Sequence, residues 1–204
     1  MLMLLTVDPA LESIVRPGWF VAEPVRVVAR DEAMDEPLRK SAAAMRAAVE
    51  SAEITASVRS MYKRVGIDPT KTRPSSEALL RRVRRGDELP RINSLVDIIN
   101  WCSLETQLPY GLYDLGKIQG DVTLRLGRDG EEYAGIRKDA VHVAGRLTLA
   151  DDTGPFGNPT SDSARTMVTT DTTRALVVIF CPASVSAAVC GAAIELTRSR
   201  IISR

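Results

Sequence analysis

The residues best suited to chemistry are two amides and a carboxylate that lie one to two helical turns apart in a single apolar stretch. Asn93, Asp97 and Asn100 fall within residues 89–101. Apolar residues recur around them at helical spacing: Ile92, Leu95, Val96 and Ile99. Such a helix could form the wall of a polar pocket. The same residues could be structural, with Asn93 as the N-cap, Asp97 bonded to nearby backbone and Asn100 as a satisfied, semi-buried amide.

A second group of polar residues follows a predicted strand near residue 150. Acids, hydroxyls and one guanidinium gather there: Asp151, Asp152, Ser161, Asp162, Ser163 and Arg165. Ordinary turn chemistry is one interpretation, and we favour it for Asp151 and Asp152. The other is that Asp162 and Arg165 form a rim that recognises an amine together with a carboxyl group or a ribose.

The sequence carries no motif for metal, cofactor or nucleophilic catalysis. It has no phosphate-binding loop, no dinucleotide fingerprint, no nucleophile elbow and no paired metal ligands, so we expect no metal and no cofactor. His142 is the only histidine, and a lone histidine among apolar neighbours is typically structural. The three cysteines, Cys102, Cys181 and Cys190, lie in apolar runs, which favours reduced, buried thiols in a cytoplasmic protein. We expect neither a signal peptide nor a membrane span.

Positive charge concentrates in one region of a nearly neutral chain. Residues 59–91 hold ten Lys and Arg against four Asp and Glu, a balance of 10 − 4 = +6, whereas the whole chain has a net charge of +1. These residues could solvate a helix end, or they could contact phosphates without reading sequence. The candidate nucleic-acid contacts are Lys71, Arg73, Arg81, Arg82, Arg84 and Arg85.

The elements that must position these residues are helices in the first half of the chain and strands in the second. Helices are predicted over 37–53, 55–65, 75–86, 92–103 and 184–199, and strands over 2–7, 19–22, 25–29, 122–126, 133–136, 145–150, 165–170 and 176–180. Residues 109–114 read as a turn and a short Tyr-Asp segment, and 153–163 as a loop. We therefore predict an α+β fold in a single domain, residues 1–204, with N-terminal helices packed on a mixed or antiparallel sheet.

Several of these stretches together carry a family resemblance. They are residues 73–80, 86–90 and 92–101, then Leu108-Pro109 and Tyr113-Asp114, and finally 161–166 with Thr169 and Thr170. Over roughly residues 59–180 the chain resembles the B3/B4 domain, the tRNA-editing module of the bacterial phenylalanyl-tRNA synthetase beta subunit. Nothing in the sequence resembles the synthetase catalytic domain, so aminoacylation is not implied.

The resemblance implies a B3/B4-like fold and an editing pocket that hydrolyses mischarged tRNA. It places the pocket asparagine at Asn100 and the turn proline at Pro109. It aligns Gly111 with a family histidine and the apolar Val178 and Ile179 with a family glutamate. The candidate substrate-binding residues are Asn100, Pro109, Tyr110, Gly111, Asp162, Arg165, Thr169 and Thr170.

Three functions are compatible with these observations. The first is a stand-alone aminoacyl-tRNA deacylase that acts in trans, with the aminoacylated 3′ end of tRNA as its partner. The second is a non-catalytic protein that binds tRNA or an amino acid. The third is an unrelated small-molecule enzyme on the same scaffold. The sequence specifies neither the amino acid nor the oligomeric state.

Overall fold

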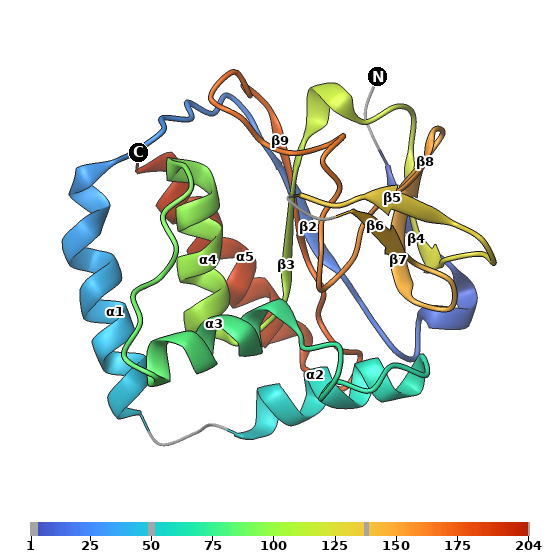
Figure 1. Ribbon diagram of the computed structural model, residues 1–204, viewed down its shortest axis with the longest axis horizontal. Coiled ribbons are helices and arrows are strands. Elements are labelled where there is room, and N and C mark those ends of the chain that lie inside the picture. Colours follow the sequence, from blue (N-terminus) through green and yellow to red (C-terminus); the bar gives the residue numbers. More distant parts are fainter. Residues whose placement is uncertain (1–3, 49–51, 137–138, 204) are drawn as a thin grey trace.

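The molecule contains three β-sheets, of four, three and two strands, and the three-stranded sheet lies between a group of helices and the four-stranded sheet (Figure 1). The computed structural model describes residues 4–48, 52–136 and 139–203. The helices are α1 (Asp35–Ala47), α2 (Ala52–Arg64), α3 (Ser75–Arg84), α4 (Ser94–Thr106) and α5 (Ala187–Ile202). This architecture confirms the predicted α+β class.

The central sheet has three antiparallel strands in the order β2 (Gly18–Ala22), β9 (Ala175–Ile179), β3 (Tyr110–Asp114). All five residues of β9 are buried, as the continuous apolar run predicted for a central strand. β3 is an edge strand, so its outward N–H groups need partners from elsewhere in the chain. The N–H of Asp114 donates to the carbonyl of Thr166 at 2.9 Å, which brings the segment after β8 alongside β3.

The second sheet has the order β1 (Leu5–Val7), β4 (Val122–Leu126), β7 (Leu147–Asp151), β8 (Gly154–Gly157). β1 pairs with β4 in parallel, and the other two pairings are antiparallel. A short hairpin, β5 (Glu132–Ala134) with β6 (Ala140–His142), stands apart from this sheet. Three 3-10 turns complete the fold: η1 (Pro9–Leu11), η2 (Glu32–Met34) and η3 (Leu115–Lys117).

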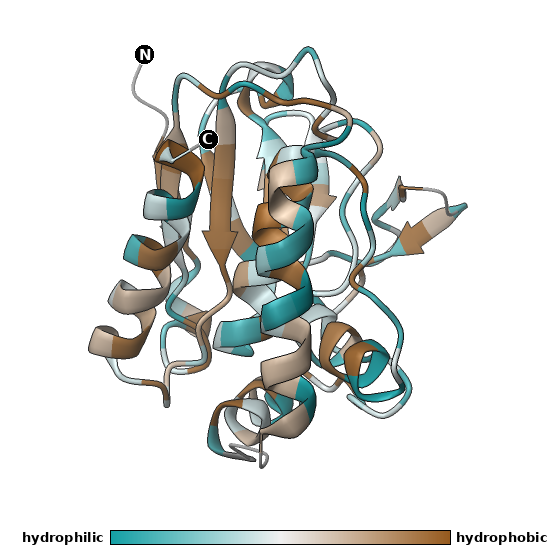
Figure 2. Cartoon of the chain, turned by 90° about the vertical axis from the view of Figure 1, so that its left-hand side faces the viewer, coloured by the Kyte–Doolittle hydropathy of each residue, from teal (hydrophilic) through white to brown (hydrophobic). Residues whose placement is uncertain are grey.

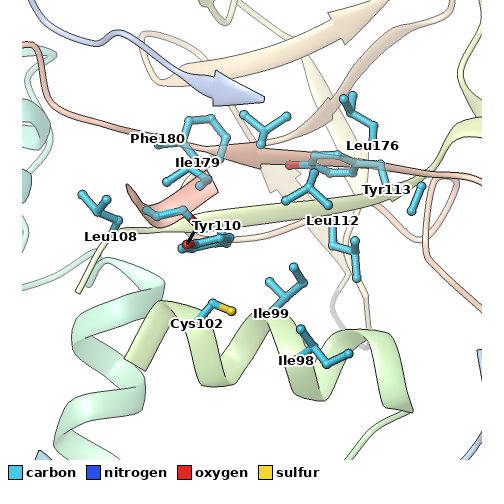
Figure 3. Close-up of a cluster of buried hydrophobic side chains, with 14 of the residues drawn as sticks. Ile98, Ile99, Cys102, Leu108, Tyr110, Leu112, Tyr113, Leu176, Ile179 and Phe180 are labelled. Carbon is cyan, nitrogen blue, oxygen red and sulfur yellow. Dashed lines mark hydrogen bonds between the residues drawn. The ribbon is translucent and has the colours of Figure 1, made fainter. Parts of the chain in front are cut away.

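Helices α4 and α5 cover the central sheet, and α1 and α3 pack outside them (Figure 1). Ile98, Ile99 and Cys102 of α4 point toward Tyr110 and Leu112 of β3, which closes the core between helix and sheet (Figure 3). Figure 2 shows hydrophilic residues along the outer surface of α1 and hydrophobic residues on the strands behind it. Helix α1 therefore buries one face, whereas α4 is buried on more than one side because it packs between the sheet and helices α1 and α3.

Four predicted segments differ from the structure. Residues 109–114, expected as a turn, contain strand β3, and the expected loop 153–163 contains strand β8. Residues 25–29 form no strand, because Val25 N–H bonds to Thr173 and Val28 N–H to the Ser94 hydroxyl instead of a neighbouring strand. Residues 165–170 alternate in polarity but form bends and turns.

The prediction of three reduced cysteines is wrong for two of them. Cys181 follows β9 and Cys190 lies in α5, and the two form a disulfide with their Cα atoms 6.3 Å apart. The end of β9 and the first turn of α5 pack together, and this contact was hidden by the apolar surroundings of both residues in the sequence. Cys102 is a buried free thiol, as predicted, and burial raises its pKa.

Candidate functional site

Two of the three polar residues of α4 have structural roles. The side-chain oxygen of Asn93 accepts the N–H of Val96 at 3.0 Å, so Asn93 is the N-cap. The buried carboxylate of Asp97 accepts the N–H of Ile92 at 2.8 Å and the Nε of Arg91 at 2.7 Å. These bonds confirm the capping and backbone-bonding interpretations and leave Asn100 as the residue available for a pocket.

Asn100 lies on the wall of a cavity of about 390 Å³ that forms where α4 meets β3, the first turns of α3 and the segment 158–168. The lining residues are Ser75, Leu79, Ile92, Val96, Ile99, Asn100, Ser103, Tyr110, Leu112, Ile136, Asn158, Thr160, Ser161, Asp162, Met167 and Val168. The size is at the lower end of small-molecule sites, which span roughly 300–1,000 Å³. Among the predicted substrate-binding residues, the cavity brings together Asn100, Tyr110 and Asp162.

The side-chain amide of Asn100 makes no hydrogen bond to any residue that the structure describes. Its neighbour on the same helix, Ser103, is engaged, because its hydroxyl donates to the carbonyl of Leu108 at 2.8 Å. The hydroxyl of Ser75, also on the cavity wall, is buried and has no hydrogen-bond partner within the described parts of the chain. An amide with two donors and an acceptor is therefore available to a ligand.

Asp162 is the one charged side chain among the described residues that line the cavity. It accepts the hydroxyl proton of Tyr113 at 2.8 Å and the backbone N–H of Leu112. No Arg or Lys of the described chain pairs with it. Burial raises its pKa to about 7, although the bonds from Tyr113 and Leu112 favour the charged form. The carboxyl group therefore changes charge near neutral pH.

Gly111 does not line the cavity but makes room for Tyr113. A Cβ atom at Gly111 or at Gly157 would overlap the Tyr113 hydroxyl, so the ring end lies between two glycines. The ring packs edge-on against Phe156, with centroids 4.9 Å apart and planes at 83°. Position 111, which the resemblance aligns with a histidine, is a glycine because the tyrosine that holds Asp162 occupies its space.

Two further tyrosines hold the segment that carries Asp162. Tyr62 of α2 bonds to the hydroxyl of Thr160 at 2.8 Å, and the Tyr133 hydroxyl of β5 accepts from the side-chain amide of Asn158 at 2.9 Å. The carbonyl oxygen of that amide caps the turn by accepting the N–H groups of Thr160 and Ser161. Burial raises the pKa of both tyrosines, so both hydroxyls stay protonated. The wall opposite α4 is thus a fixed part of the structure.

Five of the predicted substrate-binding residues lie elsewhere. Arg165 pairs with Asp151 through two bonds of 2.9 Å and lies 5.7 Å from the centre of the Phe156 ring. Pro109 is buried, and its carbonyl accepts the N–H of Phe180 at 2.9 Å. Gly111 lies under Tyr113. Thr169 closes a turn with Thr172, and Thr170 is exposed. The structure shows a local partner for Arg165, Pro109 and Thr169.

Two polar residues of the cavity wall, Asn158 and Thr160, were not among the predicted candidates. They come from the expected loop 153–163, whose abundance of Gly, Pro, Asn, Thr and Ser was the available signal, whereas Ser161 belongs to the polar group that the sequence indicated. Ser75 begins the helix predicted over 75–86 and is also the first residue of α3, with Pro74 at the N-cap position.

The predicted nucleic-acid contacts lie on and before α3, whose first turns line the cavity. Lys71 and Arg81 are exposed, and Arg82, Arg84 and Arg85 lie near the C-terminal end of the helix. Part of this charge is neutralised locally, because Arg73 lies 3.5 Å from Glu77, and Arg85 lies 3.4 Å from Asp87. The Nε of Arg82 donates to the carbonyl of Glu88 at 2.5 Å.

The described residues contain no group of three or more His, Cys, Asp or Glu side chains arranged to hold a metal ion. None of their helices combines the length and the apolar character needed to cross a bilayer.

Similar proteins were found by sequence and by structure. The chain is 34% identical over 90 residues to the phenylalanine–tRNA ligase beta subunit of Paramagnetospirillum magneticum, covering 38% of this chain and 11% of that subunit. The corresponding subunit of Chromobacterium violaceum is 35% identical over 84 residues, again covering 11% of its length. The matched part of the chain thus spans about a tenth of these curated relatives.

A solved structure shares the fold. An N-terminal fragment of the phenylalanyl-tRNA synthetase beta subunit from Pyrococcus horikoshii matches 99% of this chain and 49% of its own, with a TM-score of 0.53 and 12% sequence identity. Residues 57–198, which include α3, α4, β3 and every residue on the cavity wall, match the family described as the B3/4 domain. The chain belongs to the B3/4 domain family, as its helix α4 and the segments around it predicted.

Proposed function

We propose that the protein binds the aminoacylated 3′ end of tRNA, places the aminoacyl group in the cavity beside Asn100 and promotes hydrolysis of its ester bond. The matched relatives are subunits of phenylalanine–tRNA ligases. The resemblance of residues 59–180 to the B3/B4 domain implies an editing module. In this proposal the protein acts in trans, as a stand-alone deacylase in the cytoplasm.

The observation that carries this proposal is the unbonded amide of Asn100 on the cavity wall. An amide that is fixed on a helix but has no protein partner can hold the ester carbonyl or the attacking water. Ester hydrolysis needs little more than a water oriented toward the carbonyl carbon and donors placed where negative charge develops. Asn100 and the hydroxyl of Ser75 are two such donors on the cavity wall.

The basic residues of the region support tRNA as the partner. The first turns of α3 line the cavity, and Arg81 to Arg85 follow within the same helix or directly after it. At 1.5 Å per residue, Arg81 to Arg85 lie roughly 3–9 Å along the helix axis beyond Leu79, the last residue of α3 on the cavity wall. Phosphate contacts of this kind position a nucleic acid without reading its sequence.

A second function, non-catalytic binding of aminoacyl-tRNA or an amino acid, is favoured by one observation. Within the described part of the chain, the cavity wall includes no histidine and no cysteine. The resemblance aligns Gly111 with the histidine of the family, and Tyr113 fills that space here. A protein that kept the pocket but lost the histidine would bind without hydrolysis.

Deacylation of a panel of mischarged tRNAs tests the proposal. We expect the wild-type protein to release at least one amino acid faster than the spontaneous rate, and Asn100→Ala to reduce that rate by about 10²-fold or more, the usual cost of losing one oriented donor. Gln119→Ala, which removes an exposed amide elsewhere, is the matched control. Retained tRNA binding without release from any substrate would instead establish the binding function.

A further inference from the structure

We infer that Asp162 is the counter-charge for a primary ammonium group, and that the cavity selects amino-acid moieties with an apolar side chain. This inference rests on the proposed function for the identity of the cavity, and it adds the substrate class and the residue that recognises the amine.

The negative charge of the cavity wall comes from Asp162. Of the side chains in the described residues that line it, Asp162 alone is ionisable in the neutral range, and the others are amides, hydroxyls, Tyr110 and apolar groups. Buried carboxylates are normally paired with a cation. Asp162 has two neutral donors, Tyr113 and the Leu112 N–H, but no Arg or Lys from the described chain. Within the described residues, Asp162 therefore has hydrogen-bond donors but no cationic partner.

The protein keeps the carboxyl group of Asp162 in place. The Tyr113 hydroxyl reaches Asp162 only because Gly111 and Gly157 leave it room, and the flanking turn is held by Tyr62 and Tyr133. Burial without a cation raises the pKa of Asp162 to about 7, and a bound ammonium group would favour the charged form and lower it again. A ligand with a positive charge would thus satisfy a carboxylate that the fold has already oriented.

Apolar side chains from two segments form much of the rest of the cavity wall. Beyond Asp162 and Asn100, α4 contributes Ile92, Val96 and Ile99, and the segment after Asp162 contributes Met167 and Val168. Ile92 is 45% exposed, so its side chain is accessible to a ligand. An amine and an apolar group attached to one carbon atom fit this arrangement, whereas acidic side chains would meet Asp162.

Binding of small amides tests the inference without tRNA. L-Leucinamide carries both the ammonium group and the apolar side chain, 4-methylpentanamide lacks only the amine, and glycinamide lacks only the side chain. L-Phenylalaninamide and 3-phenylpropanamide form a second matched pair. By calorimetry or NMR titration we expect each complete amide to bind about tenfold or more tighter than its amine-free counterpart, in keeping with a charge-assisted hydrogen bond.

The variant Asp162→Asn should bind the members of each pair equally. Glu132→Gln, which removes an exposed negative charge outside the cavity wall, should keep the preference for the amine. A carbon-detected NMR titration of the Asp162 carboxyl in the wild-type protein gives an independent readout if the asparagine variant unfolds: leucinamide should lower the pKa of this group, and 4-methylpentanamide should not.

Three results would overturn the inference: equal binding of leucinamide and 4-methylpentanamide, unchanged amine preference in Asp162→Asn, or no binding of any of the amides. Two further results separate the two proposals. Amine-selective binding together with no deacylation of any tRNA would support the recognition role of Asp162 and refute hydrolysis. Loss of deacylation in Asp162→Asn with unchanged amide binding would make Asp162 a proton acceptor and refute the counter-charge role.

Discussion

At the scale of single residues, Gly111 and Tyr113 occupy adjacent space on one face of β3. The tyrosine ring turns back over the glycine, and its hydroxyl is fixed against Asp162. The family histidine that the resemblance placed at position 111 could not coexist with this ring. In this chain the space next to position 111 is therefore filled by Tyr113, whose hydroxyl donates to Asp162.

We predict that Gly111→Ala destabilises the protein by about 1–3 kcal/mol, the typical cost of an added methyl group in a packed site. The methyl group would displace the Tyr113 ring and weaken its bond to Asp162. Thermal unfolding of Gly111→Ala, alone and combined with Tyr113→Leu, measures this, and the double variant should recover part of the loss. Gly191→Ala is the control, because no atom lies within 4 Å of the added Cβ and the glycine is helical.

Arg165 illustrates how a plausible binding residue can have a local partner. The sequence suggested a rim with Asp162, but the guanidinium forms two bonds to Asp151, whose side chain is fully buried. Burial raises the pKa of Asp151, but the bonds from Arg165, the Gln119 N–H and Thr153 outweigh burial and lower it.

We predict that Arg165→Met lowers the free energy of unfolding by about 2–4 kcal/mol, somewhat less than the 3–5 kcal/mol for a fully buried pair, because the Arg165 side chain is 34% exposed. The reason is that Asp151 would keep its charge without a cation. Denaturant unfolding measures the loss, and Arg165→Met with Asp151→Asn should restore most of it. Unchanged stability with lost tRNA or amide binding would return Arg165 to the substrate site.

At the scale of secondary structure, α3 and α4 bring the basic region and the cavity together. α4 was predictable because its apolar spacing, its Asn93 cap and its Asp97 backbone bonds are all local. Strand β9 was predictable from its continuous apolar run. Strands β3 and β8 were not, because Pro109, Gly111 and Gly154 suggest turns, and only pairing with distant strands makes these segments extended.

The basic residues on and before α3 remain a predicted contact for tRNA. We expect Lys71→Ala with Arg81→Ala to weaken tRNA binding and to reduce the slope of log K against log salt by roughly one to two, since each lost phosphate contact changes it by about 0.7–0.9. Both residues are exposed on or next to the helix that borders the cavity.

Filter binding over a range of salt concentrations gives this slope. Arg26→Ala with Arg128→Ala removes the same charge from exposed positions outside residues 59–91 and should leave the slope nearly unchanged. An equal effect of both double variants would mean that only the total charge matters.

At the scale of the whole molecule, the cavity joins segments that are far apart in the chain. α3, α4, β3 and residues 158–168 meet only because β9 lies between β2 and β3 and the segment after β8 runs along the free edge of β3. Asn100 could be predicted from the family signature on one helix. The place of Asn158 on the cavity wall and the hydrogen bonds that Asp162 accepts from Tyr113 and Leu112 depend on this long-range assembly, so the sequence alone could not reveal them.

The free energy of unfolding of the protein should depend on pH through the ionisation of Asp162. Its pKa is raised from 3.8 to about 7, so the folded state binds more protons than the unfolded state between these values, and this residue's contribution to stability falls as pH rises through that range. We predict that the free energy of unfolding of the wild type, relative to Asp162→Asn, declines from pH 4 to pH 7.

Urea unfolding at a series of pH values measures this difference. Tyr113 and Tyr133 are the titratable side chains that face Asp162 from β3 and β5, and burial raises the pKa of both, so neither changes charge in this range. A difference that is flat with pH, or that grows in favour of the wild type, would contradict the raised pKa of Asp162.

The packing of Tyr113 between two glycines also restricts the order in which this site can have changed during evolution. The Tyr113 hydroxyl can keep its present position only while positions 111 and 157 are both glycine, because a side chain at either would overlap it. The reverse path, from this chain to one with a histidine at position 111, must first remove the hydroxyl. The three positions should therefore vary together among relatives, and each combination should mark a lineage with its own pocket chemistry.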